Sequence, residues 1–285
     1  MLRKRGTTSM AARQKKRKQT RKNTRPRSRE TKKRQRAPVK KTRATLNIEK
    51  SILHVRVARY NPQMDFHART HEYHVTLNKG ESVLDLLTRI HETQDGSLTF
   101  RASCGYGGCG ACGVKVNGKT VLGCVTQVSD LMTENQTIHI EPLHENVIKD
   151  LVVDEKPFFD ELEKISPWIT PRINDVKRNH KMGINDVQKL GNAHQCILCG
   201  ICNAHAESQK TGELGPAAMV KAYRYRMDVR DANTQRDAVI SKQFPVHYSL
   251  EKANACPRSI FPGDKIKEMR ELSHKQKQTF RGVKK

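Results

Sequence analysis

The chain contains 285 residues, of which 35% are hydrophobic, and its formal net charge is +25. At roughly 150 residues per domain this length allows about two domains, and the mean hydropathy of −0.75 predicts a modest core. The sequence has no run of about 18 apolar residues, which excludes a transmembrane segment of that kind and predicts that any membrane contact is peripheral.

The positive charge is concentrated at the N-terminus. Residues 1–46 hold 20 Lys and Arg residues and one acid, Glu30, so they carry +19 of the net charge and leave +6 for the rest. Because so few of these residues are apolar, we predict a disordered basic tail. The tail has three interpretations. It is a phosphate-binding arm that contacts RNA, DNA or an anionic membrane surface, or a solubilising tail, or a transit peptide. The candidate contact residues are Lys15, Lys16, Arg17, Lys18, Lys32, Lys33 and Arg34.

Alternating apolar residues after the tail predict strands at Ile52–Val57 and His71–Leu77, joined as a hairpin around Asn61–Phe66. Ser82 is positioned to cap a short helix. The apolar face expected for that helix consists of Val83, Leu84, Leu87 and Ile90.

A glycine-rich loop, Ser103–Gly113, holds the first cysteines. Cys104, Cys109 and Cys112 follow a C-x4-C-x2-C pattern, and eleven residues separate Cys112 from Cys124, which is typical of a plant-type [2Fe–2S] site. The segment Val114–Val121 contains Asn-Gly and predicts a type I′ hairpin that leads to Cys124. Thr137–Ile140 is expected to complete a sheet packed on one helix.

From Asn146 onward the pattern predicts helices, first with Phe158, Phe159, Leu162 and Ile165 at helical spacing. A polar stretch, Lys177–Lys189, precedes the second group of cysteines. After it, Gly215-Pro216 opens a predicted helix, Ala217–Arg230. Its residues Tyr223, Arg224 and Arg226 are interpreted as a basic surface or, more simply, as a solvated helix face, and we expect the solvated face. The last segment, Lys265–Lys285, is again basic and polar.

The second group of cysteines predicts another cluster. Cys196, Cys199 and Cys202 follow a C-x2-C-x2-C pattern, and a distant Cys256-Pro completes the set expected for a bacterial-type [4Fe–4S] module. Structural zinc, disulfides and inert core cysteines are the alternatives for both groups. The two complete spacings together favour electron transfer, and none of the eight cysteines is left over.

Five segments resemble the iron–sulfur subunit of succinate dehydrogenase and fumarate reductase, with the resemblance running from about Ile52 to Leu272. They are CGYGGCGACGVKVNG (Cys104–Gly118), PLHENVIKDLVVD (Pro142–Asp154), CILCGIC (Cys196–Cys202), ELGPAAMVKAYRYRMDVRD (Glu213–Asp231) and ACPRSIFPGDKI (Ala255–Ile266). The resemblance implies an α+β protein with an N-terminal β-grasp [2Fe–2S] ferredoxin domain at 47–145 and an α-helical [4Fe–4S] ferredoxin domain at 146–275. Residues 276–285 are then a basic C-terminal tail.

The sequence departs from that family at one cluster. The family carries a third, [3Fe–4S] cluster, and the three positions that match its cysteine ligands are Ala206, Val246 and Lys252 here, so no [3Fe–4S] cluster is expected. The family's Cys-Pro-Ser and tryptophans near the quinone are replaced by Ala206–Lys210, and the sole tryptophan is Trp168. His247 matches a family histidine near that site, where we expect a structural role.

Two functional hypotheses follow. In the first, the chain is the electron-transfer subunit of a succinate dehydrogenase/fumarate reductase-type oxidoreductase, has no catalytic residue of its own and works with a flavoprotein subunit. Electrons would leave to a soluble carrier or another subunit, and a membrane anchor is a further expected partner. In the second, the chain is a repurposed structural component of a ribonucleoprotein such as an organellar ribosome. We expect a peripheral location at the cytoplasmic face of a membrane or at the mitochondrial matrix and inner membrane, and no secretion.

Overall fold

The computed structural model describes residues 52–171 and 181–282, and all of these belong to one compact unit, Leu46–Lys285. The predicted basic tail, with its candidate contact residues at 15–18 and 32–34, lies outside the described residues. Residues 172–180, which include the first four residues of the polar stretch before the second group of cysteines, also lie outside them.

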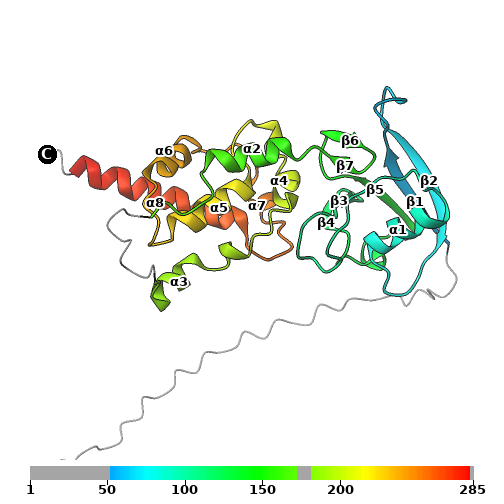
Figure 1. Cartoon of the computed structure of the whole chain (residues 1–285), viewed down its shortest axis with the longest axis horizontal. Coiled ribbons are helices and arrows are strands. Elements are labelled where there is room, and N and C mark those ends of the chain that lie inside the picture. The colour runs from blue at the N-terminus through cyan, green and yellow to red at the C-terminus, as the bar shows by residue number, and fades with distance from the viewer. Residues whose placement is uncertain (1–51, 172–180, 283–285) are drawn as a thin grey trace, which may run out of the picture. The chain divides into compact units, whose positions relative to one another are not determined.

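The N-terminal half is built on a mixed five-stranded sheet in the order β2-β1-β5-β3-β4 (Figure 1). β1 and β5 pair in parallel, whereas the other neighbours pair antiparallel. This arrangement matches the predicted β-grasp topology, including the hairpin between the first two strands. The strands are β1 (Ile52–Arg59), β2 (Arg69–Thr76), β3 (Gly113–Val116), β4 (Lys119–Leu122) and β5 (Thr137–Pro142).

Helix α1 (Val83–Thr93) packs on this sheet and begins where the sequence predicts. The Ser82 hydroxyl accepts a hydrogen bond from the Asp85 N–H, and the Asp85 carboxylate accepts one from the Ser82 N–H, which forms a reciprocal capping box. Leu86 is buried in the sheet core and was missed by the prediction. Leu84 instead packs against a small apolar cluster beside the first group of cysteines.

The turn between β3 and β4 has the backbone expected for a type I′ hairpin. Asn117 and Gly118 both have positive φ angles, 48° and 76°. The Asn117 side chain also donates to the Leu131 carbonyl and accepts from the His139 N–H. The turn is therefore fixed to the rest of the sheet.

The prediction of helical structure from Asn146 is wrong for its first residues. Short antiparallel strands β6 (Val147–Lys149) and β7 (Val152–Val153) come first, because this stretch is rich in β-branched residues. Asp150 takes a left-handed backbone conformation at the turn, with φ of 48°.

Asp150 ties this small hairpin to the sheet through a buried ion pair. Its carboxylate accepts a hydrogen bond from the Arg59 guanidinium at 2.9 Å and others from the N–H groups of Tyr60 and Thr99. The Arg59 and Asp150 side chains are only 8% and 2% exposed, and Arg59 also pairs with Asp95. One buried cation thus joins three segments that are distant in the sequence.

The C-terminal half is helical (Figure 1). Its helices are α2 (Lys156–Lys164), α3 (Ile184–Leu190), α4 (Ile201–Ala206), α5 (Pro216–Arg226), α6 (Thr234–Lys242), α7 (Leu250–Ala253) and α8 (Pro262–Gly282). Short 3₁₀ turns occur at Val128–Asp130, Ala193–Gln195 and Ser208–Lys210. Because α8 extends to Gly282, the predicted boundary at residue 275 lies inside a helix.

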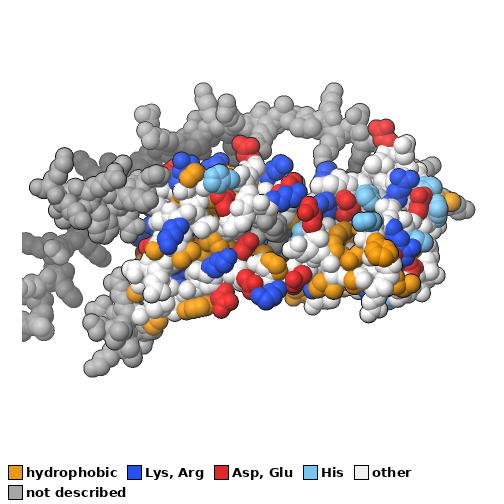
Figure 2. All heavy atoms as spheres, turned by 90° about the horizontal axis from the view of Figure 1, so that it is seen from above, with side chains coloured by type: hydrophobic (Ala, Val, Ile, Leu, Met, Phe, Trp, Pro, Cys, Tyr) orange, Lys and Arg blue, Asp and Glu red, His pale blue; other side chains and the backbone are white. Residues whose placement is uncertain are grey.

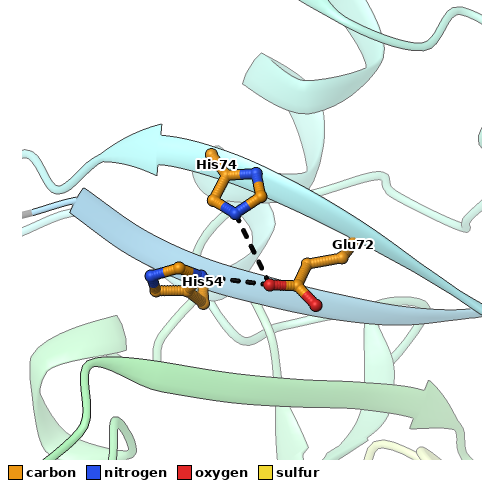
Figure 3. Close-up of side chains that lie close together, drawn as sticks. All are labelled: His54, Glu72 and His74. Atoms are coloured by element: carbon orange, nitrogen blue, oxygen red, sulfur yellow. Dashed lines mark hydrogen bonds and ion pairs between the residues drawn. The ribbon is translucent and has the colours of Figure 1, made fainter.

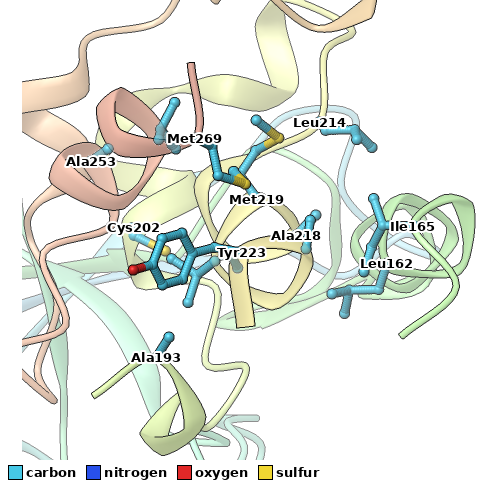
Figure 4. Close-up of a cluster of buried hydrophobic side chains, with 14 of the residues drawn as sticks. Leu162, Ile165, Ala193, Cys202, Leu214, Ala218, Met219, Tyr223, Ala253 and Met269 are labelled. Carbon is cyan, nitrogen blue, oxygen red and sulfur yellow. The ribbon is translucent and has the colours of Figure 1, made fainter. Parts of the chain in front are cut away.

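Helix α5 forms the centre of the helical core. Figure 4 shows Met219 and Tyr223 of α5 among Leu162, Cys202 and Met269 from other segments. In and just after α2, Phe158, Leu162 and Ile165 are buried, whereas Phe159, which the sequence grouped with them, is 49% exposed.

The prediction of a solvated face on α5 is wrong. Tyr223 is buried, and its hydroxyl donates to Glu268 of α8 at 2.9 Å. The Arg224 and Arg226 side chains are 20% and 12% exposed and form ion pairs with Asp228 and Asp237. The helix also ends four residues earlier than predicted, since the chain turns at Asp228. These basic residues hold the fold together and do not form a free basic surface.

Within residues 52–171 and 181–282, none of the helices combines the length and apolar character needed to cross a membrane.

We predict that Asp150→Ala lowers the free energy of unfolding by about 3 kcal/mol. The loss lies at the low end for breaking a buried ion pair, because Asp95 still faces Arg59. Chemical denaturation under anaerobic conditions measures it. In the control Arg69→Ala, which removes a largely exposed partner of Asp65, the change stays within about 0.5 kcal/mol. Equal losses in the two variants would contradict the structural role of Asp150.

Candidate functional site

The first group of cysteines surrounds a loop whose backbone N–H groups point at sulfur. Gly107 donates to Cys124 Sγ at 3.2 Å, and Gly108 donates to Cys104 Sγ at 3.2 Å. The Cys109 N–H also donates to Cys104 Sγ, and the Cys124 N–H donates to Cys112 Sγ. Donors aimed at sulfur stabilise thiolates and tune the potential of a bound cluster.

The four thiols of this group sit in unequal environments. Hydrogen bonding from the Tyr106 N–H lowers the pKa of Cys104 to about 6. Burial raises the pKa of Cys112 to about 11. Cys109 and the neighbouring Tyr106 are exposed, and Tyr106 is 76% exposed. One side of the loop is therefore protein-covered, while the other faces solvent.

The second group of cysteines lines a single narrow cavity, with about 10 Å³ of space, roughly enough for one water molecule. Cys196, Cys199, Cys202 and Cys256 all border it, as the sequence predicts for one shared site. Left-handed backbone at Leu198 and Gly200 folds the C-x2-C-x2-C run around this space. The rest of the lining is largely apolar and includes Ile197, Ala217, Val220, Pro257, Ile260 and Pro262.

Burial dominates the chemistry of these thiols. It raises the pKa of Cys196, raises that of Cys199 to about 11 and raises that of Cys202 well above its ordinary value. The Lys221 ammonium opposes the effect at Cys196 and donates to the Cys196 carbonyl at 3.0 Å. Metal ligands must be thiolates, so loading this site releases protons.

The two groups of cysteines meet across an apolar contact. Cys112 and Cys124 of the first group and Cys199 of the second border one cluster, which also contains Leu84, Leu122, Leu143, Ile197, Ile201 and Ala204. Gly110 lies against Cys199 so closely that a Cβ atom on Gly110 would fall 2.7 Å from Cys199 Cβ. The first cysteine loop thus packs directly on the second.

The spacing of the sulfur atoms argues against single zinc ions. A tetrahedral Cys₄ zinc site has Zn–S bonds of about 2.3 Å, which places its sulfur atoms roughly 3.8 Å apart. All eight cysteines are among the described residues, and no three of their sulfur atoms lie within 4.8 Å of one another. In a [2Fe–2S] cluster only two cysteines share each iron, and in a [4Fe–4S] cluster each cysteine binds its own, so neither cluster needs three sulfur atoms around one metal ion and both fit this spacing better than zinc.

The three positions that match the third cluster hold no sulfur ligand and differ in their surroundings. Ala206 is 5% exposed and packs into the helical core, and Val246 packs partly buried against the same core. Lys252 is exposed and lines an open hollow beside His205 and Glu207.

Nearby lysines are balanced by acids. Lys210 forms ion pairs with Glu145 and Glu207, both at 3.1 Å. The pKa of Glu207 is lowered first by Lys210 and further by Lys252. His247, the histidine that matches the family, contacts Glu213. The Glu213 carboxylate pairs with the His247 ring and accepts a hydrogen bond from the His247 backbone N–H. A structural role for His247 agrees with these contacts.

Comparison with known proteins defines the class. Residues 54–160 match the family described as 2Fe-2S iron-sulfur cluster binding domain, so the chain is an iron–sulfur protein. It is 30% identical over 237 residues to the mitochondrial succinate dehydrogenase [ubiquinone] iron-sulfur subunit of Dictyostelium discoideum, covering 78% of this chain and 82% of that one. The chain belongs to the succinate dehydrogenase iron–sulfur subunit family, which confirms the family predicted from the sequence.

A solved structure supports the same assignment. The structure of the Mycobacterium smegmatis Sdh1 complex in the apo form contains a chain that matches with a TM-score of 0.72 and 26% identity. The match covers 80% of this chain and 98% of that chain. An α+β fold like that of succinate dehydrogenase and a role as an iron–sulfur electron-transfer subunit follow from these relationships.

Two side chains near the second site were missed by the sequence reasoning. Lys221 places its ammonium beside Cys196, and the fully buried Asn203 accepts from the Ala217 N–H at 2.9 Å, which fixes the start of α5. Asn203 directly follows Cys202, and Lys221 lies in a segment already singled out, but only the fold shows where either side chain points.

Replacing Gly110 tests the contact between the two groups of cysteines. In Gly110→Ala, the left-handed backbone costs about 1 kcal/mol, and the clash with Cys199 adds about 1–3 kcal/mol. Gly105→Ala is the matched control, because Gly105 has a similar positive φ but no atom within 4 Å of an added Cβ. We expect lower stability and a lower iron content for Gly110→Ala than for Gly105→Ala. Indistinguishable variants would mean that the loops do not touch.

Proposed function

We propose that the chain carries electrons between a flavoprotein subunit and an acceptor through two clusters. The [2Fe–2S] cluster is held by Cys104, Cys109, Cys112 and Cys124, and the [4Fe–4S] cluster by Cys196, Cys199, Cys202 and Cys256. The observation that carries this proposal is the packing of Gly110 on Cys199, because it brings one complete set of thiols directly against the other.

The clusters, when bound, supply one-electron redox chemistry, and the chain supplies their environment. Loop N–H groups that donate to Cys104 and Cys124 stabilise negative charge on sulfur. The apolar contact around Ile201 excludes water between the two sites. The α-helical half acts as the [4Fe–4S] ferredoxin domain in this proposal.

The flavoprotein is proposed to dock on the exposed side of the first loop. Cys109 and Tyr106 are among the exposed residues there, so a partner can approach the [2Fe–2S] cluster closely. The curated relative's name places it in succinate dehydrogenase. By family relationship, the partner flavoprotein would oxidise or reduce the dicarboxylate.

The exit of electrons is proposed to differ from that of the three-cluster family pattern. None of Ala206, Val246 and Lys252 offers a thiolate, so a [3Fe–4S] cluster has no ligands at the matching positions. A soluble carrier or another subunit then takes electrons from the [4Fe–4S] cluster. Local pairing of Lys210 with Glu145 and Glu207 reduces the positive field that this lysine could offer to an acidic acceptor.

A peripheral location is proposed, at the mitochondrial inner membrane or at the cytoplasmic face of another membrane. The relative from Dictyostelium discoideum is named as mitochondrial, which favours the first setting. A membrane anchor would then be supplied by another subunit.

Low-temperature EPR tests which clusters the two groups of cysteines hold. We expect protein purified anaerobically to hold about six iron atoms per chain and, after dithionite reduction, to show [2Fe–2S] and [4Fe–4S] signals. The Cys256→Ser variant should lose the [4Fe–4S] signal and keep the [2Fe–2S] signal. An oxidised [3Fe–4S] signal of stoichiometric intensity in the unsubstituted protein would contradict the proposal.

Activity of the assembled complex tests the exit route. With the flavoprotein bound, we expect succinate to reduce a soluble artificial acceptor while ubiquinone is reduced poorly, because the third cluster is missing. The flavoprotein alone provides the background rate. Normal quinone reductase activity in the purified complex would rule out the proposed exit.

A further inference from the structure

Three metal-ligating side chains meet on the outer face of the sheet, away from the cysteines. His54 comes from β1, and Glu72 and His74 come from β2 (Figure 3). Figure 2 shows that histidines gather at the same end of the described chain as these strands. Among the described residues, this is the one group of three or more candidate ligands whose donor atoms all lie within 4.8 Å of one another.

Strand register explains why these side chains meet. His54 lies directly opposite His74 in the antiparallel β1–β2 pair. Glu72 precedes His74 by two residues, so both project from the same face of β2. The opposite face carries Leu53, Val55 and the core residues of β2, which leaves the polar set on the solvent side. The sheet therefore holds the three ligands without help from a flexible loop.

The distances suit a small tetrahedral cation. One oxygen, Glu72 Oε1, lies 3.0 Å from His54 Nδ1 and 3.5 Å from His74 Nε2. Zinc bonds to nitrogen and oxygen are about 2.0–2.1 Å long, which places tetrahedral ligand atoms roughly 3.3–3.4 Å apart. The two histidine rings lie edge to face with their centroids 4.7 Å apart. Only small rotations are needed for both nitrogen atoms and the carboxylate oxygen to face one ion.

We propose that His54, Glu72 and His74 form a binding site for a divalent zinc-class cation, distinct from the two cysteine sites. Two imidazoles and one carboxylate are ligands that zinc accepts, and they leave a fourth position for water or a group from a partner. The three side chains are 43%, 37% and 58% exposed, so an ion can enter from solvent. Bound there, it links β1 to β2, the edge strand of the sheet.

Arg56 determines which carboxylate oxygen of Glu72 is available to bind the ion. Its Nε lies 3.3 Å from Glu72 Oε2, the oxygen that faces away from the histidines. The carboxylate therefore offers only Oε1 to the ion and binds through one oxygen. The neighbouring His71 lies on the other face of β2, against Tyr73, and takes no part.

Calorimetric titration of the full chain with Zn²⁺ tests the site, using protein that retains its iron so that cysteine binding stays constant. The double variant His54→Asn/His74→Asn should lose one Zn²⁺ per chain, and Glu72→Gln should bind it more than about 10-fold more weakly. His71→Asn, on the same strand, is the matched control and should bind like the unsubstituted protein. Mg²⁺, which prefers oxygen ligands, should give no comparable heat.

Zinc-edge anomalous diffraction of zinc-soaked crystals locates the ion. A peak between the rings of His54 and His74 is expected, and circular dichroism confirms that each variant remains folded. The proposal is overturned if the unsubstituted chain binds no Zn²⁺, if the double variant binds it unchanged, or if the anomalous peak lies only at the cysteines.

Discussion

The apolar contact between the two groups of cysteines is the constraint on which the rest of the structure depends. Leu84, Leu143 and Ile201 come from the sheet half, the linking segment and the helical half, and all three enter this one cluster. Each element must therefore end at the right place for Gly110 to reach Cys199. This close approach depends on the short β3–β4 hairpin and on the left-handed residues around Cys199.

Burial of the thiols links metal binding at the second site to folding of the helical half. Cys202, Ile260 and Val220 line the same narrow cavity, and burial disfavours the thiolate form of the cysteines. A cluster bound there would offset this cost, because metal ligation neutralises the sulfur charge. Under the proposed function, folding of the helical half and acquisition of its cluster would then be parts of one equilibrium.

Much of this arrangement could be predicted from local sequence patterns. Cysteine spacing predicted which cysteines lie together in each half, Asn117-Gly118 predicted a hairpin, and Ser82 predicted a helix start, because each signal depends mainly on residues close in the chain. Errors arose where distant contacts decide the outcome. Arg224 and Arg226 looked solvent-facing until their acidic partners were placed, and β6 and β7 form in a stretch whose turn residue is held by Arg59. The His54–Glu72–His74 group depends on strand register, which no local pattern specifies.

The pairing of Asp150 with Arg59 also affects how the chain can be divided. All four cysteines of the first group lie before residue 125, and the last strand of the sheet ends at Pro142. A fragment ending there would contain every ligand of the first site, yet it would leave the Arg59 guanidinium buried without the carboxylate that satisfies it. The smallest autonomous electron carrier in this chain therefore extends past Asp150, into the segment that resembles an inter-domain linker.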